Sequence, residues 1–146
     1  MLLLDHSSSS ALVVDTAVPP SAHLVHEAVI QAWPRLAGRV TFIVAPMDSV
    51  ALGADDVVVS CHACGALTDQ VLSLATAARA RVAVLPCCHD ADTCDTGSLT
   101  GWVEPALAID TMRALRLDQQ GYLVWTQVIP AEITQKNRLL IGAPRP

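Results

Sequence analysis

Residues 57–69 read VVVSCHACGALTD, and residues 81–89 read RVAVLPCCH. Each stretch begins with a short apolar run, typical of a buried parallel strand, and ends in a tip of cysteine and histidine. The apolar periodicity of residues 68–78 predicts one helix between them. Because a helical crossover joins neighbouring parallel strands, we expect both tips at the same edge of one sheet.

The other segments continue this alternation of strands and helices. The predicted strands lie at 11–14, 40–44, 56–60, 81–85, 122–129 and 138–141, and the predicted helices lie at about 20–32, 68–78 and 105–118. This order predicts an α/β fold with a mainly parallel sheet and helices on its faces. The last two strands predict a C-terminal antiparallel hairpin. A length of 146 residues predicts one domain over residues 1–146.

The composition limits the function classes. Hydrophobic residues make up 52% and charged residues 16%, which favours a large buried fraction or an oligomer interface. The net charge is −5 and the nine basic residues are scattered, so the charge pattern does not support nucleic-acid binding. No apolar run reaches the roughly 18 residues that a membrane span needs, and the first residues lack the pattern of a secretory signal. We therefore expect a soluble, cytoplasmic protein whose five cysteines are reduced.

The two tips carry residues that can bind a metal. Thiolates and imidazoles bind zinc, copper and iron–sulfur centres. The C-x-x-C spacing of the first two cysteines is also typical of a redox dithiol. Against a metal, adjacent cysteines on a strand are expected to point to opposite faces, and cysteine is often a buried packing residue. The residues of this possible cluster are Cys61, Cys64, Cys87, Cys88 and His89.

Four further residues near the tips have expected roles. His62 is either a general base, since its ordinary pKa is near 6.5, or a histidine satisfied by nearby backbone groups. Thr68 and Asp69 are predicted to cap the following helix. Cys94 is the best candidate for an exposed thiol, although its acidic neighbours disfavour a thiolate.

The two tips resemble one branch of the S-adenosylmethionine-dependent methyltransferase domains. In that branch one strand ends in a His-Ala-Cys-Gly motif followed by Thr-Asp, as at 62–69, and the next ends in Pro-Cys-Cys, as at 86–88. A group of tRNA 2'-O-methyltransferases and the glutathione S-transferase C-terminal-domain-containing proteins look similar there. Residues 129–141 resemble the last hairpin of such domains. The resemblance covers most of the chain from Ala11 onward.

The resemblance implies a Rossmann-like methyltransferase fold that uses S-adenosylmethionine to methylate an unknown acceptor. Asp15, at a strand end, would bind the cofactor ribose, and Asp48 would lie beside the adenine. Gly65 and Asp69 would complete the cofactor site. The strand end where methyl transfer or substrate contact occurs would carry Cys61, His62 and Cys64.

The chain departs from the family pattern at its beginning. The family starts with a strand and a glycine-rich turn that lets the backbone approach the cofactor. None of the seven glycines precedes Gly38, and no two have G-x-G spacing. Before Ala11, only Met1 to Leu4 could form a short strand. The resemblance therefore implies a fold truncated at its N-terminus.

A missing first strand suggests a partner. A second copy, in a homodimer or larger homo-oligomer, or a different chain could supply the strand. Two alternatives to a methyltransferase stay open. One is a non-catalytic, oligomeric binding module derived from the same fold, and the other is a metal or redox protein that uses the cysteines and histidines.

Overall fold

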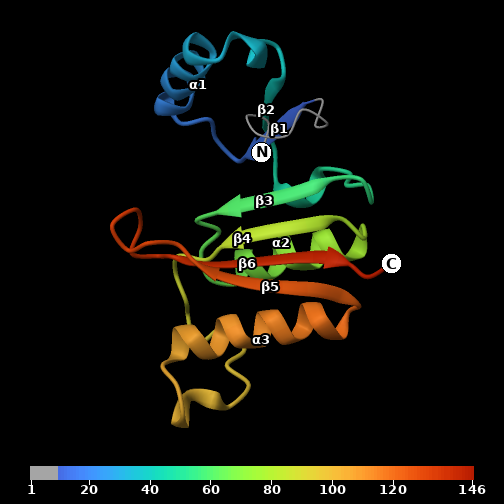
Figure 1. Ribbon diagram of the computed structural model, residues 1–146, viewed down its shortest axis with the longest axis vertical. Helices are drawn as coiled ribbons and strands as arrows, with labels where there is room; N and C mark the ends of the chain where they lie inside the picture. Colours follow the sequence, from blue (N-terminus) through green and yellow to red (C-terminus); the bar gives the residue numbers. More distant parts are fainter. Residues whose placement is uncertain (1–9) are drawn as a thin grey trace. The chain divides into compact units, whose positions relative to one another are not determined.

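The computed structural model describes residues 10–146, so the possible strand at Met1 to Leu4 lies outside the described residues. The chain divides into two compact units, Met1–Ala51 (unit 1) and Leu52–Pro146 (unit 2), which are described separately (Figure 1). The prediction of one domain stays a prediction. The two units hold different parts of the expected site.

Unit 1 contains one strand–helix–strand element, as predicted. Its elements are β1 (Ala11–Asp15), α1 (Pro20–Ala32), a 3₁₀ turn (Pro34–Leu36), β2 (Val40–Val44) and a second 3₁₀ turn (Met47–Ser49). The two strands pair in parallel, with Ala11 opposite Val40 and Asp15 opposite Val44. Among the described residues of unit 1 only Leu36 is buried. Unit 1 therefore has almost no apolar interior of its own.

Unit 2 contains the two sequence motifs and the C-terminal hairpin. Its elements are β3 (Val57–Cys61), α2 (Ala66–Ala77), β4 (Arg81–Leu85), a 3₁₀ turn (Leu99–Gly101), α3 (Pro105–Gln119), β5 (Tyr122–Val128) and β6 (Arg138–Pro144). The strand order is β3-β4-β6-β5. The pair β3–β4 is parallel, whereas β6 runs antiparallel to both of its neighbours.

The α/β class, the order of the elements and the C-terminal hairpin are thus confirmed. The prediction of a mainly parallel sheet holds only for the pairs β1–β2 and β3–β4. The sheet of unit 2 is mixed, because β6 returns between β4 and β5 instead of at the edge. The Rossmann-like methyltransferase fold stays a prediction.

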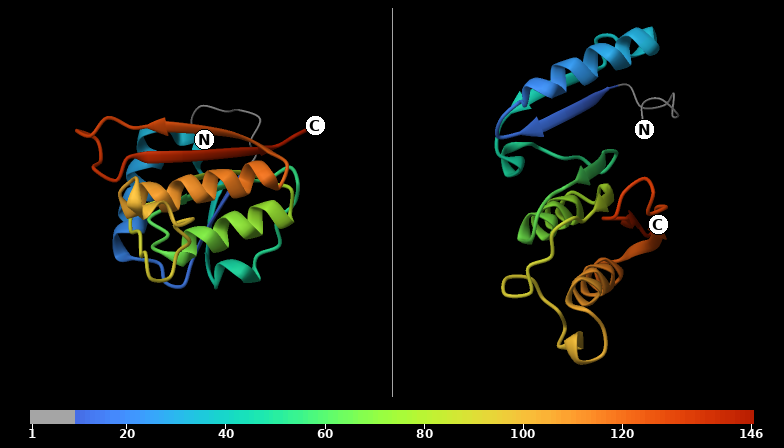
Figure 2. Two further views of the ribbon diagram at one scale, coloured as in Figure 1. Left: turned by 90° about the horizontal axis from the view of Figure 1, so that it is seen from below. Right: turned by 90° about the vertical axis from the view of Figure 1, so that its left-hand side faces the viewer.

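The sheet of unit 2 has helices on one face. Figure 2 shows α2 and α3 side by side beneath the strands. The core between these two layers contains Val82, Val84, Ile109, Leu117 and Leu140, all buried. Side chains alternate along a strand, so Leu123 and Trp125 lie on the face opposite to the buried Tyr122. Within unit 2, both helices therefore cover the same face of the sheet.

The buried Tyr122 connects β5 to the helical layer by hydrogen bonds. Its ring is fully buried, and its hydroxyl lies 2.9 Å from the carbonyl oxygen of Ala80 and 3.2 Å from that of Ala75. We expect Tyr122→Phe to lower the free energy of unfolding by about 1–2 kcal/mol, because two buried carbonyls lose a donor. Urea unfolding measures this, with the exposed Gln127→Ala on the same strand as the control. Equal urea midpoints of unfolding for Tyr122→Phe and Gln127→Ala would refute this role of the Tyr122 hydroxyl.

Candidate functional site

The two cysteine tips lie at one edge of the unit 2 sheet. Cys61, the last residue of β3, is in register with Leu85, the last residue of β4. Beyond the strands, the backbone N–H of Gly65 donates to the carbonyl oxygen of Cys88 at 3.0 Å. The expectation that both tips emerge at the same edge is confirmed. We refer to residues 62–65 and 86–90 together as the rim.

The backbone of the rim has a left-handed turn directly after β3. His62 has a φ of +66°, which is uncommon for a residue with a side chain, and Gly65 has a φ of +55°. Such conformations are concentrated at active sites and ligand-binding loops. The side chain of His62 is exposed. The turn therefore presents an imidazole to solvent beside the cysteines.

Three thiols of the rim form a compact group. The Sγ atom of Cys64 lies 3.4 Å from that of Cys87 and 3.3 Å from that of Cys88. The Sγ atoms of Cys87 and Cys88 are 3.6 Å apart. Cys87 is buried, whereas Cys64 and Cys88 are exposed. This cysteine cluster (Cys64, Cys87 and Cys88) could hold a metal ion.

The cluster corrects one expectation. Adjacent cysteines on a strand would point to opposite faces, but β4 ends at Leu85, so Cys87 and Cys88 lie beyond the strand. Their thiols can therefore both approach Cys64, and the objection to a metal site does not apply. Neither Cys61 nor His89 belongs to the group of possible ligands found among residues 10–146.

The contacts among the three sulfurs shift the pKa values of Cys64 and Cys88 in opposite directions. The hydrogen bond to Cys88, followed by that to Cys87, raises the pKa of Cys64 to about 12. The same contacts lower the pKa of Cys88, because the thiols of Cys64 and Cys87 stabilise its thiolate. The positive charge of Lys136 acts on Cys88 in the same direction. Cys88 is therefore expected to ionise at a lower pH than Cys64.

This difference predicts the order of alkylation in the reduced, metal-free chain. A lowered pKa means that Cys88 is a thiolate at a lower pH than an ordinary cysteine, so iodoacetamide reacts with it first as the pH rises. Cys64 reacts after Cys88, because its pKa is raised. Peptide mass spectrometry over a pH series measures the order. In Cys64→Ala the alkylation midpoint of Cys88 should move to higher pH, and faster labelling of Cys64 than of Cys88 at neutral pH would contradict the assignment.

A buried arginine lies directly behind the rim. Arg113 of α3 has only 1% of its surface exposed. It donates to both carboxylate oxygens of Asp69, at 2.8 and 3.2 Å, and to the carbonyl oxygen of Gly65 at 2.9 Å. Burial opposes its charge, but the hydrogen bonds and charge of Asp69 outweigh burial and raise the pKa of Arg113. Arg113 therefore connects α3 to the turn that carries Cys64.

Asp110 extends this network to the second tip. One of its oxygens lies 3.2 Å from Arg113 and 2.8 Å from Nε2 of His89. Its other oxygen lies 2.7 Å from Nε of Arg138. His89 is thus held in place by Asp110 instead of facing the cysteine cluster.

Arg113 and Asp110 were not among the predicted site residues. A signal for Arg113 was present, because it lies four residues from both Ile109 and Leu117 on the apolar face of α3. A lone arginine on such a face is expected to be buried with an acidic partner. No comparable signal distinguished Asp110 from other helix carboxylates.

Two other expectations near the rim were wrong. No side chain caps α2, because the hydroxyl of Thr68 donates to the carbonyl oxygen of Ala63 and Asp69 binds Arg113. Cys94 is buried, not exposed, and its Sγ atom lies 3.8 Å from Arg113. For Asp69 and Cys94 a contact with Arg113 outweighs the local preference, whereas the Thr68 hydroxyl bonds to a nearby backbone carbonyl.

The residues expected to bind the cofactor are divided between the units. Asp15 ends β1, and Asp48 lies just after β2, so both occur at the carboxyl edge of the parallel pair in unit 1. Both are exposed. Gly65 and Asp69 belong to the rim and its supporting network in unit 2. The carboxylate of Asp69 is already paired with Arg113, and Arg116 lies 3.6 Å away.

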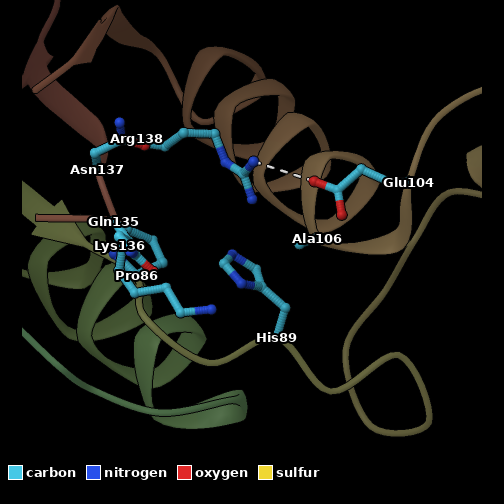
Figure 3. A pocket seen from close by; sticks show the side chains of 8 residues that line it. All are labelled: Pro86, His89, Glu104, Ala106, Gln135, Lys136, Asn137 and Arg138. Carbon is cyan, nitrogen blue, oxygen red and sulfur yellow. Dashed lines mark hydrogen bonds and ion pairs between the residues drawn. The ribbon is translucent and has the colours of Figure 1, made fainter. Parts of the chain in front are cut away.

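A small polar pocket adjoins the rim. Its volume is about 160 Å³, and it is lined by Pro86, His89, Glu104, Ala106, Gln135, Lys136, Asn137 and Arg138. Figure 3 shows the ring of His89 and the guanidinium of Arg138 pointing into the same space, with Arg138 paired to Glu104. Pro86 and His89 flank Cys87 and Cys88 in the chain. Two residues of the rim therefore line the pocket.

No protein-family model and no curated protein matches the chain. Within residues 10–146, none of the helices has both the length and the apolar character needed to cross a bilayer. The interpretation of the site therefore depends on its own residues: three close thiols, an exposed imidazole and a buried charge network.

Proposed function

We propose that the chain is a methyltransferase-like domain that binds S-adenosylmethionine or a related nucleoside and acts at the rim. The observation that carries the proposal is the parallel pairing of β3 and β4. It brings together the two motifs on which the resemblance rests, with Cys61 opposite Leu85. In open α/β sheets, ligands bind beyond the carboxyl ends of parallel strands.

In unit 1, Asp15 and Asp48 are the carboxylates proposed for the ribose and the adenine, and both residues are exposed. The proposal gives Asp69 a positioning role, because it orients Arg113 and through it Gly65. When bound, S-adenosylmethionine supplies an electrophilic methyl group. His62 would accept the proton that the methyl acceptor loses, with Cys61 and Cys64 beside it.

Calorimetric titration with S-adenosylmethionine and S-adenosylhomocysteine tests this proposal. We expect saturable binding that Asp15→Asn weakens about tenfold, equivalent to about 1.4 kcal/mol. Glu27→Gln, an exposed acidic residue of α1 in the same unit, is the matched control. The proposal fails if about millimolar protein gives no heat of binding with either compound.

The second candidate function is binding of a transition-metal ion by the cysteine cluster. The observation that favours it is the mutual closeness of the three Sγ atoms, all within 4.8 Å. Thiolates select soft or borderline ions, and zinc is the commonest of these with cysteine ligands. Zinc is therefore the proposed ion, with Cys64, Cys87 and Cys88 as its ligands.

Elemental analysis of the reduced chain, dialysed against zinc and then against buffer, tests the metal site. One equivalent of zinc per chain is expected. A content below about a tenth of an equivalent would exclude a stable site. This result does not depend on nucleoside binding, so the two proposals are tested separately.

The third candidate is assembly with a second copy of the chain. Between residues 10 and 51, unit 1 has one buried residue, and unit 2 exposes 56% of Val59 and 51% of Trp125 on its sheet. Apolar surface of this kind favours association, and the open sheet edges could pair with another copy. Light scattering should give at least twice the mass of one chain. A monomer at every concentration would contradict a homo-oligomer.

A further inference from the structure

We infer that the polar pocket beside the rim binds a small hydroxy carboxylate, with Lys136 holding the carboxylate and His89 the hydroxyl. The pocket has a volume of about 160 Å³, below the roughly 300 Å³ at which sites for drug-sized ligands begin. Water occupies about 30 Å³ per molecule in the liquid, so the ligand is no larger than roughly five water molecules. Neither the proposed nucleoside nor the proposed metal ion is needed for this binding.

The ring of His89 has one nitrogen that is free for a ligand. Only 8% of its side chain is exposed, and Nε2 lies 2.8 Å from a carboxylate oxygen of Asp110. No partner for Nδ1 is found among residues 10–146, and in that range no fully buried side-chain nitrogen or oxygen lacks a partner. Nδ1 is therefore accessible from the pocket that the ring lines, and Figure 3 shows the ring pointing into this space.

Asp110 determines which hydrogen bond Nδ1 can make. A carboxylate only accepts hydrogen bonds, so Nε2 carries the hydrogen, and Nδ1 of the neutral ring presents a lone pair. Arg113 and Arg138 both donate to the same carboxylate and hold it in this orientation. The group of the ligand that meets Nδ1 is therefore a hydrogen-bond donor, such as a hydroxyl.

Lys136 is the cation of the pocket whose charge a ligand can compensate. Arg138, which also lines the pocket, is paired with Asp110 and Glu104, at 2.7 and 3.1 Å. Within the described part of the chain, no carboxylate lies within ion-pair distance of Lys136. In Figure 3 its side chain extends toward the ring of His89. A ligand with one negative charge beside its donor group therefore fits the pocket.

The N-terminus of α3 adds to the attraction for an anion. Glu104 and Ala106 line the pocket, and they flank Pro105, the first residue of the helix. The first N–H groups of a helix have no partner within it, and this end carries a partial positive charge. The carboxylate of Glu104 is paired with Arg138. A carboxylate bound by Lys136 therefore gains from the helix end as well.

NMR titration of the full, reduced, isotope-labelled chain tests the two contacts separately. The ligands are glycolate, acetate without the hydroxyl, ethylene glycol without the carboxylate, and phosphate as a tetrahedral anion. We expect glycolate to shift the amide signals of His89, Ala106 and Arg138 saturably, with a dissociation constant of about a millimolar. Acetate should bind about tenfold more weakly, because the hydrogen bond to Nδ1 is missing. Ethylene glycol should give no saturable shift.

The variant Lys136→Gln should bind glycolate at least about tenfold more weakly than the unchanged chain. Lys136 is exposed, so the substitution leaves the core intact. Arg145→Gln is the matched control, because it removes the same charge just beyond the end of β6, the strand that begins at Arg138. This control should bind glycolate as the unchanged chain does. Equal affinities for glycolate and acetate, tighter binding of phosphate, full affinity in Lys136→Gln, or no saturable shift with glycolate would each overturn the inference.

Discussion

Replacing Arg113 with methionine is expected to lower the free energy of unfolding by about 3 kcal/mol. The guanidinium is buried and bound to Asp69 and Asp110, so the substitution leaves two carboxylates without their shared cation. It also removes the donor to the carbonyl oxygen of Gly65. Breaking a buried ion pair is costly because the remaining charge has lost both water and its partner. Urea unfolding followed by circular dichroism measures the loss.

Arg116→Met is the matched control for this prediction. Arg116 is on the same helix and approaches the same Asp69, but its side chain is 44% exposed. Exposed ion pairs contribute below about 1 kcal/mol, so this variant should unfold close to the unchanged chain. If Arg113→Met were no less stable than Arg116→Met, the network behind the rim would not have the role assigned to it.

Removing any one thiol of the cysteine cluster is expected to weaken zinc binding at least about 100-fold. Loss of a group that only supports a ligand already costs about 10–100-fold in affinity, and these cysteines are proposed as the ligands themselves. The variants are Cys64→Ser, Cys87→Ser and Cys88→Ser. Competition with a chromophoric chelator measures the affinity of each. All three variants should lose zinc binding at the same site.

Cys61→Ser provides the control for the thiol variants. Cys61 is exposed and lies in the same motif, three residues before Cys64, but it is not in the cluster. The affinity of the Cys61→Ser variant for zinc should equal that of the unchanged chain. A loss as large as that of Cys64→Ser would mean that the C-x-x-C pair, and not the cluster, binds the ion.

The sequence predicted the fold well where local patterns determine it. Apolar runs predicted each strand and α-helix found in residues 10–146, because buried strands and amphipathic helices have distinct periods. The last strand continues to Pro144, three residues beyond its predicted end. The helix after residue 65 begins at Ala66, two residues earlier than predicted, because Gly65 forms its start. The position of β6 between β4 and β5 has no local signal, since pairing partners depend on the whole sheet.

The site was also predicted only in part, because some of its contacts follow from local patterns and others from long-range partners. The two tips were expected together because parallel strands joined by a helix are neighbours, and Cys64 does meet Cys87. Whether Cys88 could join them depended on where β4 ends, which a pattern gives only to within a few residues. The roles of Asp69 and Cys94 were misjudged, because both depend on Arg113, a long-range partner.

Disulfide mapping after mild oxidation of the metal-free, folded chain tests most directly whether the two tips meet. With a disulfide reagent as oxidant, we expect a bond from Cys64 to Cys88 or Cys87, whose sulfurs lie 3.3 and 3.4 Å away. Cys61 should remain reduced. A bond between Cys61 and Cys64, with Cys87 and Cys88 still reduced, would show that the two tips do not meet.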